Sequence, residues 1–175
     1  MPRNPTNICA HRGDSSRFRE NTLVAIQSAI DAGAEVIEID VRISKDGKVV
    51  VIHDPTLERL WGLDRYVSDV TWQEISALGS GNFKIPLLEE VLPLFENSNS
   101  ILMIDMEESD PAKLAFEVSV KSSATIYWCG DLEGMRIIRS LSESANIWMP
   151  WNVNATVTAS DIAELKPTFI NSHYS

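Results

Sequence analysis

The fold of this chain is best read from the stretch EVIEIDVRISKDGKVVVIHD, residues 35–54. It contains two short apolar runs, 35–41 and 49–53, with the length and β-branched composition of buried strands. Only RISKDGK, residues 42–48, separates them, and its Asp46-Gly47 pair is a hairpin turn signal. A turn this short leaves no room for a helical crossover, so the pattern predicts that these two strands run antiparallel.

Outward from this stretch, short apolar runs alternate with segments of helical period, which is typical of βα units with a parallel sheet. The predicted strands cover residues 8–11, 35–41, 49–53, 101–105, 124–129, 146–151 and 168–172. The predicted helices cover residues 22–32, 87–96, 111–121, 132–142 and 159–165. The stretch 54–86, rich in Trp, Gly and Pro, has no place in this alternation, and we interpret it as an inserted subdomain or lid within a single domain, residues 1–175.

Composition excludes some classes of protein. The 175 residues carry a formal net charge of −10 with no basic patch, which argues against binding to nucleic acid. The N-terminus has no apolar core of signal-peptide length, and no run approaches the roughly 18 apolar residues of a membrane span. Cys9 and Cys129 lack metal-site spacing, and we expect them to be small buried side chains in a reducing, cytoplasmic setting. The oligomeric state is left open.

The first site that could carry chemistry is AHRG, residues 10–13. His11 closes the first predicted strand, Gly13 permits a sharp exit, and Arg12 offers a guanidinium fork suited to phosphate or carboxylate. Taken alone, such a tripeptide also fits a structural or surface position.

The second site is Glu38 and Asp40, which lie two residues apart and therefore on one face of a strand. Two carboxylates side by side in an apolar run are unfavourable without a counter-ion, and Mg²⁺ and Ca²⁺ take such oxygen ligands. The alternative is that this strand has one solvated face, although parallel strands are usually covered on both faces.

The third site is His53 with Asp54, directly after the apolar run VVVI. Alone, His53 could be a satisfied core residue. Together with His11 it offers an acid and a base near neutral pH, as the hydrolysis of a stable ester requires. Asp54 could fix the tautomer of a neighbouring histidine.

The fourth site is ILMIDMEES, residues 101–109. Strand alternation places Asp105 and Glu107 on the same face, so both can point toward the carboxylates of Glu38 and Asp40. Three carboxylates with water and substrate oxygens make a plausible Mg²⁺ or Ca²⁺ site. We expect Glu108, beyond the strand, to be solvated.

Taken together, AHRG, RENT at 19–22, EIDVRISKDGKVVVIHDPTLER at 38–59 and IPLLEEVL at 85–92 resemble the glycerophosphodiester phosphodiesterase family in order and spacing. The resemblance implies a (β/α)₈ TIM barrel of the phospholipase-C-like type, with a small insertion after the third strand. It also implies hydrolysis of glycerophosphodiesters, as small-molecule substrates, to sn-glycerol 3-phosphate and an alcohol. Since such a barrel needs about 250 residues, we expect the barrel to be incomplete at its C-terminus and Ser175 not to be the natural end.

The resemblance also assigns residues. By position, His11 and His53 match the family's acid and base pair, and Arg12 matches a phosphate-binding arginine. Glu20, in the RENT motif, is the same residue as in the family pattern. The metal ligands it implies, for one divalent cation (Mg²⁺ or Ca²⁺), are Glu38, Asp40 and Asp105. In the family mechanism a glycerol hydroxyl attacks phosphorus to give a cyclic phosphate, which water then opens.

Glu107 is the main departure from the family pattern, because the family usually has a phosphate-contacting Lys at this position. An added anion should weaken phosphodiester binding unless Glu107 is itself a metal ligand or a second cation is recruited. Two alternatives to the first activity therefore remain. One is a lysophospholipase D or sphingomyelinase D type of phosphodiesterase, and the other is a non-catalytic metal-binding homologue.

Overall fold

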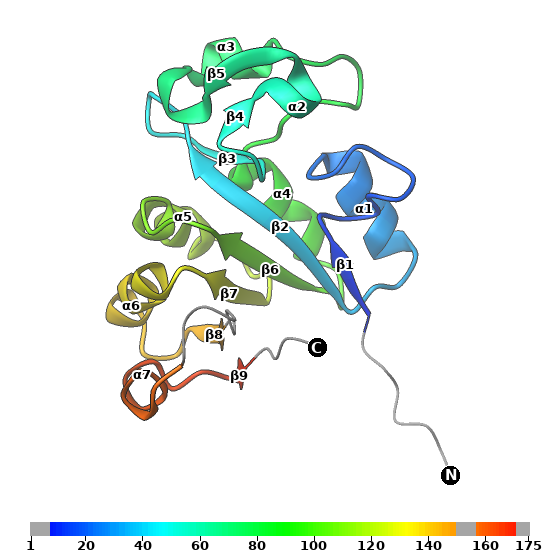
Figure 1. The fold of residues 1–175 in the computed structure, drawn as a ribbon. Coiled ribbons are helices and arrows are strands. Elements are labelled where there is room, and N and C mark those ends of the chain that lie inside the picture. The colour runs from blue at the N-terminus through cyan, green and yellow to red at the C-terminus, as the bar shows by residue number, and fades with distance from the viewer. Residues whose placement is uncertain (1–7, 150–156, 171–175) are drawn as a thin grey trace.

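The computed structural model describes residues 8–149 and 157–170, which form an α/β partial barrel (Figure 1). Its main sheet has six parallel strands in the order β1-β2-β6-β7-β8-β9, and β3 pairs with β2. The parallel strands are β1 (Cys9–His11), β2 (Val36–Ile43), β6 (Ile101–Met106), β7 (Ile126–Gly130), β8 (Asn146–Met149) and β9 (Phe169–Ile170). The predicted incomplete TIM-type barrel is confirmed for this part of the chain, with six parallel strands and the attached β3 in place of seven barrel strands.

The third predicted strand does not belong to the parallel set. Strand β3 (Val49–Val51) is antiparallel to the end of β2, with Val41 opposite Val51 and Ile43 opposite Val49. The Asp46-Gly47 turn causes this reversal, since Gly47 has a φ of 76° and its N–H donates to the Ser44 carbonyl. The expected antiparallel pairing is therefore correct, but β3 is a short extension of β2 and not a barrel strand of its own.

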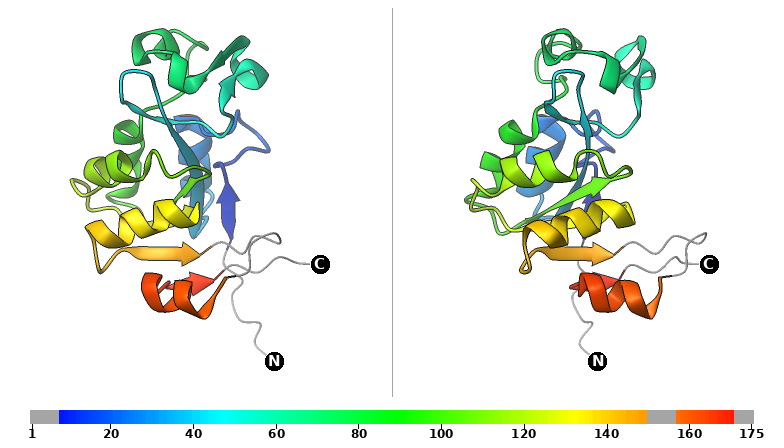
Figure 2. Two further views of the ribbon diagram at one scale, coloured as in Figure 1. Left: turned by 60° about the vertical axis from the view of Figure 1, so that its left-hand side comes forward. Right: turned by 90° about the vertical axis from the view of Figure 1, so that its left-hand side faces the viewer.

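The helices follow the predicted segments closely and cover the outer face of the sheet (Figures 1 and 2). They are α1 (Leu23–Asp31), α4 (Leu88–Phe95), α5 (Ala112–Ser119), α6 (Leu132–Leu141) and α7 (Ala159–Leu165). Helix α1 starts where the Thr22 hydroxyl accepts a hydrogen bond from the Ala25 N–H. None of the helices in the described part of the chain is long and apolar enough to span a bilayer.

The core lies between these helices and the outer face of the sheet. Ile37, Ile39 and Val41 of β2 point into it, together with Leu102 and Ile104 of β6. Because side chains alternate along a strand, Glu38, Asp40 and the even-numbered positions of β2 point to the inner side. Of the two cysteines, Cys129 is buried as expected, but Cys9 is exposed, because β1 is an edge strand in the described part of the sheet.

Residues 54–86 form small elements of their own above the sheet in Figure 1. These elements are β4 (Thr56–Leu57), α2 (Glu58–Trp61), β5 (Leu63–Tyr66), a 3₁₀ turn (Val67–Asp69) and α3 (Trp72–Ser76). They enclose a second apolar cluster, in which Leu57, Val67 and Ile75 pack against Val50 and Ile52. This cluster anchors the segment to the end of β3.

Candidate active site

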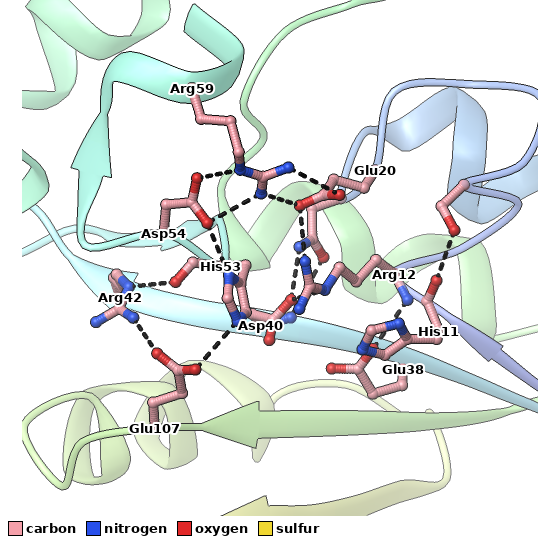
Figure 3. A network of polar contacts seen from close by, with 12 residues as sticks. His11, Arg12, Glu20, Glu38, Asp40, Arg42, His53, Asp54, Arg59 and Glu107 are labelled. Atoms are coloured by element: carbon pink, nitrogen blue, oxygen red, sulfur yellow. Dashed lines mark hydrogen bonds and ion pairs between the residues drawn. The ribbon is translucent and has the colours of Figure 1, made fainter. Parts of the chain in front are cut away.

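The residues singled out in the sequence meet at the carboxyl ends of β1, β2 and β6. His11 lies opposite Glu38 in the parallel register of β1 and β2, and Asp40 lies opposite Asp105 in that of β2 and β6. His53 follows β3, which folds back along the end of β2. Figure 3 shows the imidazoles of His11 and His53 approaching from opposite sides, with Arg12 and Asp40 between them.

Three side chains of β2 form a row on its inner face. Glu38, Asp40 and Arg42 are exposed to only 5%, 6% and 7%, which contradicts the alternative that this strand has a solvated face. Asn21 secures the central one, because its amide Nδ2 donates to Asp40 Oδ2 over 2.7 Å and its Oδ1 accepts from the Asp40 N–H over 3.2 Å. Asn21 adopts a left-handed φ of 58° to do so.

The carboxylates at this site repel one another. Burial, and then the charge of Asp40, raise the pKa of Glu38, while burial raises the pKa of Asp40. Burial together with the charges of Asp40 and Glu107 raises the pKa of Asp105 to about 6. Such a group of oxygen donors suits a hard divalent cation. Within residues 8–149 and 157–170, no three His, Cys, Asp or Glu side chains are gathered around one point as metal ligands.

Arg12 is held against this carboxylate row. Its backbone N–H donates to Glu38 Oε2 over 2.8 Å, its Nη1 donates to Glu20 Oε1 over 2.9 Å, and its Nε lies 3.3 Å from Asp40 Oδ2. The chain turns sharply here, since Arg12 has a φ of 60° and Gly13 a φ of 76°. A Cβ at Gly13 would lie 2.7 Å from the Ala25 carbonyl carbon, so this turn requires glycine.

The two histidines have different surroundings. The His11 side chain is 69% exposed, and its Nε2 lies 3.9 Å from Glu38 Oε2. Partial burial, and then the charge of Arg12, lower the pKa of His11. His53 is closer packed, with Nδ1 at 2.8 Å from Asp54 Oδ1 and Nε2 at 3.0 Å from Glu107 Oε1. A neutral imidazole has one N–H, so these two carboxylates compete for it.

Glu107 bridges His53 and Arg42. Arg42 Nη2 donates to Glu107 Oε2, and Arg42 Nε donates to the His53 carbonyl over 2.6 Å. Glu108, expected to be solvated, is 64% exposed but also lies 3.4 Å from Arg42 Nη1. Arg42 therefore contacts both acids that directly follow β6, Glu107 and Glu108, and its Nε holds the backbone carbonyl of His53.

Three residues of this site were not singled out as site residues from the sequence: Arg42, Asn21 and Arg59. Arg42 carried a usable signal, because it shares the strand face of Glu38 and Asp40. Asn21 and Arg59 did not, because their contacts depend on loop geometry that no periodic pattern reports. Arg59, on α2, donates to both Asp54 and Glu20 (Figure 3). The structure thus brings the predicted residues to one edge of the sheet, and three arginines, Arg12, Arg42 and Arg59, connect most of them. Asp105 is placed there by its register with Asp40.

Comparison with known proteins agrees with this geometry. The model of the glycerophosphoryl diester phosphodiesterase family matches residues 11–168. A glycerophosphodiester phosphodiesterase of Bacillus altitudinis is 40% identical over 110 residues, which is 58% of this chain and 44% of that protein. The human lysophospholipase D GDPD1 is 35% identical over 104 residues, or 51% of this chain and 33% of that protein. The chain thus spans less than half the length of these two relatives.

Among solved structures, the glycerophosphodiester phosphodiesterase of Thermotoga maritima superposes with a TM-score of 0.82 and 31% sequence identity. The match covers 95% of this chain and 73% of that one.

Proposed function

The chain belongs to the glycerophosphoryl diester phosphodiesterase family, and from this premise we propose that it hydrolyses glycerophosphodiesters to sn-glycerol 3-phosphate and an alcohol. The observation that carries the proposal is the meeting of His11, Arg12 and His53 with the carboxylates of β2 and β6 at one edge of the sheet. Two imidazoles, a guanidinium and a set of oxygen ligands are the groups that cleavage of a phosphodiester needs.

One divalent cation, Mg²⁺ or Ca²⁺, fits the donor set at this edge. Glu38, Asp40 and Asp105 would hold it, and the raised pKa values of the three acids support this, because a bound cation relieves their repulsion. Such an ion supplies Lewis-acid stabilisation of negative charge on the phosphoryl oxygens.

The chain's own residues then have separate tasks. Arg12 binds a phosphoryl oxygen, for which its fixed guanidinium is well suited. One imidazole accepts the proton of the glycerol hydroxyl as its oxygen bonds to phosphorus, and the other donates a proton to the departing alcohol oxygen. The product is a cyclic phosphate. Water then opens this ring with the two imidazoles in exchanged roles.

The test is a turnover assay on glycerophosphocholine that measures released sn-glycerol 3-phosphate. We expect activity with added Mg²⁺ or Ca²⁺, its loss in excess chelator, and a fall of at least about 100-fold in His11→Ala and in His53→Ala. Asp31→Asn, on the exposed part of α1, is the matched control and should keep full activity. Full activity of either histidine variant would contradict its assignment.

A second substrate class follows from the likeness to a lysophospholipase D. Lysophosphatidylcholine presents the same diester linkage with an acyl chain, so both substrates should be assayed side by side, with sphingomyelin as a third. A higher kcat/KM on an acylated substrate would replace the first assignment.

The contact of Glu107 with His53 supports a third reading, a metal-binding homologue without turnover. Calorimetry that shows Mg²⁺ or Ca²⁺ binding, with no turnover of any of the three diesters, would favour it.

A further inference from the structure

Arg59 occupies a central place in the polar network although it comes from the segment 54–86 and touches neither histidine. Its guanidinium contacts two carboxylates at once. Nε lies 2.5 Å from Asp54 Oδ2 and Nη2 lies 2.9 Å from Asp54 Oδ1. Toward the other side, Nη2 lies 2.6 Å from Glu20 Oε1, and Nη1 lies 3.4 Å from Glu20 Oε2.

Each of these carboxylates in turn contacts one of the groups assigned to catalysis or phosphate binding. Asp54 Oδ1 lies 2.8 Å from His53 Nδ1, and Glu20 Oε1 accepts from Arg12 Nη1 over 2.9 Å. A continuous path of charge-assisted hydrogen bonds therefore runs from Arg12 through Glu20, Arg59 and Asp54 to His53 (Figure 3).

The negative charges of Glu20 and Asp54 explain why a cationic side chain, that of Arg59, lies between them. Glu20 and Asp54 approach the same guanidinium from two loops, and without it they would repel each other and lose their fixed orientation. Hydrogen bonding to Arg59 is the largest cause that lowers the pKa of Asp54, to about 2. Burial raises the pKa of Glu20, but its hydrogen bonds to Arg59 and Arg12 leave it lowered. Both acids are thus kept ionised as acceptors for Arg12 and His53.

Only the planar fork of arginine satisfies this geometry. A lysine ammonium is a point charge on a flexible stem, and it cannot hold two carboxylates in one plane with four contacts. Helix α2 has a separate attachment, since the Arg19 guanidinium lies over the Trp61 ring, 4.6 Å from its centroid. Loss of the Arg59 head group should therefore leave α2 in place.

We propose that Arg59 is a positioning residue for the hydrolysis assigned above: through Glu20 it sets the guanidinium of Arg12, and through Asp54 it sets the imidazole of His53. The inference rests on the proposed function. It makes the segment 54–86 part of the machinery, because the residue that aligns both groups belongs to that segment.

The experiment compares Arg59→Met, which keeps the stem and removes the fork, with Arg59→Lys. The matched control is Arg65→Met in the same segment, since Arg65 is similarly exposed and pairs with Glu74, away from the site. We expect Arg59→Met to lower kcat/KM by about 10- to 100-fold, the loss typical when a group that orients a metal ligand by hydrogen bonding is removed. Arg59→Lys should lie closer to Arg59→Met than to the wild type, and Arg65→Met should be within about twofold of the wild type.

The split between kcat and KM separates positioning from a merely structural role. Asp54→Asn should lower mainly kcat, Glu20→Gln should raise mainly KM, and Arg59→Met should do both. In the Arg59→Met background, the further change Asp54→Asn should lower kcat by a clearly smaller factor than it does in the wild type. The reason is that both substitutions break the same path of hydrogen bonds. The inference is overturned if Arg59→Met loses no more activity than Arg65→Met, or if the two effects on kcat are additive.

A second measurement does not depend on turnover. The chain contains three histidines, so the ring ¹⁵N shifts of His53 can be assigned with a His53→Gln variant. We expect these shifts, which report the tautomer, to change in Arg59→Met and to stay fixed in Arg65→Met. Unchanged shifts in Arg59→Met would overturn the inference, whereas absence of turnover in the wild type would overturn only the proposed function.

Discussion

Replacing Asp105 by Asn should stabilise the metal-free protein. In the folded chain, burial and the charges of Asp40 and Glu107 raise the pKa of Asp105 from 3.8 to about 6. A rise of roughly two pKa units corresponds to about 3 kcal/mol by which folding disfavours the ionised carboxylate. Asparagine has the same shape without the charge, so we expect about 2 to 3 kcal/mol of added unfolding free energy at pH 8.

The sign and the pH window follow from the raised pKa of Asp105. Between pH 3.8 and about 6 the folded protein holds this proton more tightly than the unfolded chain does. The unfolding free energy of the wild type therefore falls as the pH rises through this window and stays low above it. The advantage of Asp105→Asn should be fully present above pH 6, fall to about 0.5 kcal/mol at pH 4, and vanish well below pH 3.8, where the carboxyl is neutral in both states.

The measurement is urea unfolding in excess chelator at pH 8 and at pH 4, with Asp110→Asn as the control because Asp110 is exposed just beyond β6. Added Mg²⁺ or Ca²⁺ should stabilise the wild type, by about 2.7 kcal/mol at 100 times the dissociation constant, and should not stabilise Asp105→Asn to the same extent. The reasoning is refuted if Asp105→Asn is neutral or destabilising at pH 8 without metal, since the carboxylate would then not be under repulsion.

Three further changes test the surroundings of the site. Gly130→Ala places a Cβ 2.1 Å from the Met106 carbonyl oxygen at a φ of 115°, so urea unfolding should show a loss of at least about 2 kcal/mol, and a loss under 0.5 kcal/mol would contradict this geometry. Asn21→Ala removes both hydrogen bonds to Asp40. In a Mg²⁺ titration monitored by the thermal unfolding temperature, the Mg²⁺ concentration at the midpoint should therefore rise about tenfold or more. An unchanged midpoint would refute this role of Asn21. Glu107→Gln removes a negative charge beside the phosphodiester, so kcat/KM should rise about threefold or more in the turnover assay, and a fall would show that Glu107 assists the reaction.

Most of the candidate site was predictable from the sequence, because the regular geometry of strands determines which of its residues lie together. Alternation puts Glu38 and Asp40 on one face, and the carboxyl ends of parallel strands meet at one edge, so residues far apart in sequence were expected together. The same rule covers Arg42, whose contacts with Glu107 and His53 follow from its place in the row. Regular secondary structure carries this information without any knowledge of loops.

The remaining contacts were not predictable for a physical reason. Asn21 reaches Asp40 only because its backbone takes a left-handed φ of 58°, which side-chain patterns do not report. Arg59 reaches Glu20 only because the segment 54–86 folds over the end of β3 around its own apolar cluster. The role of β3 was also not predictable, since a turn signal gives the reversal of the chain but does not show whether the strand after it is a barrel strand or, as here, a short extension of β2.

The acidic residue at position 107 has a different meaning in the folded protein than in the sequence. As one more anion at a phosphodiester site it would oppose binding, but the structure pairs it with Arg42, whose positive charge offsets part of the negative charge of Glu107 and Glu108. The cost then depends on position: Glu107 Oε1 lies 3.0 Å from His53 Nε2, a nitrogen that a reacting oxygen would have to approach. If His53 acts in the proposed hydrolysis, substrate binding must displace Glu107 from it, and Arg42 is placed to retain Glu107 when it moves. A substrate whose alcohol carries a positive charge would draw Glu107 away from His53 at lower cost than a neutral one, so kcat/KM should favour glycerophosphocholine over glycerophosphoglycerol, and Glu107→Gln should remove that preference.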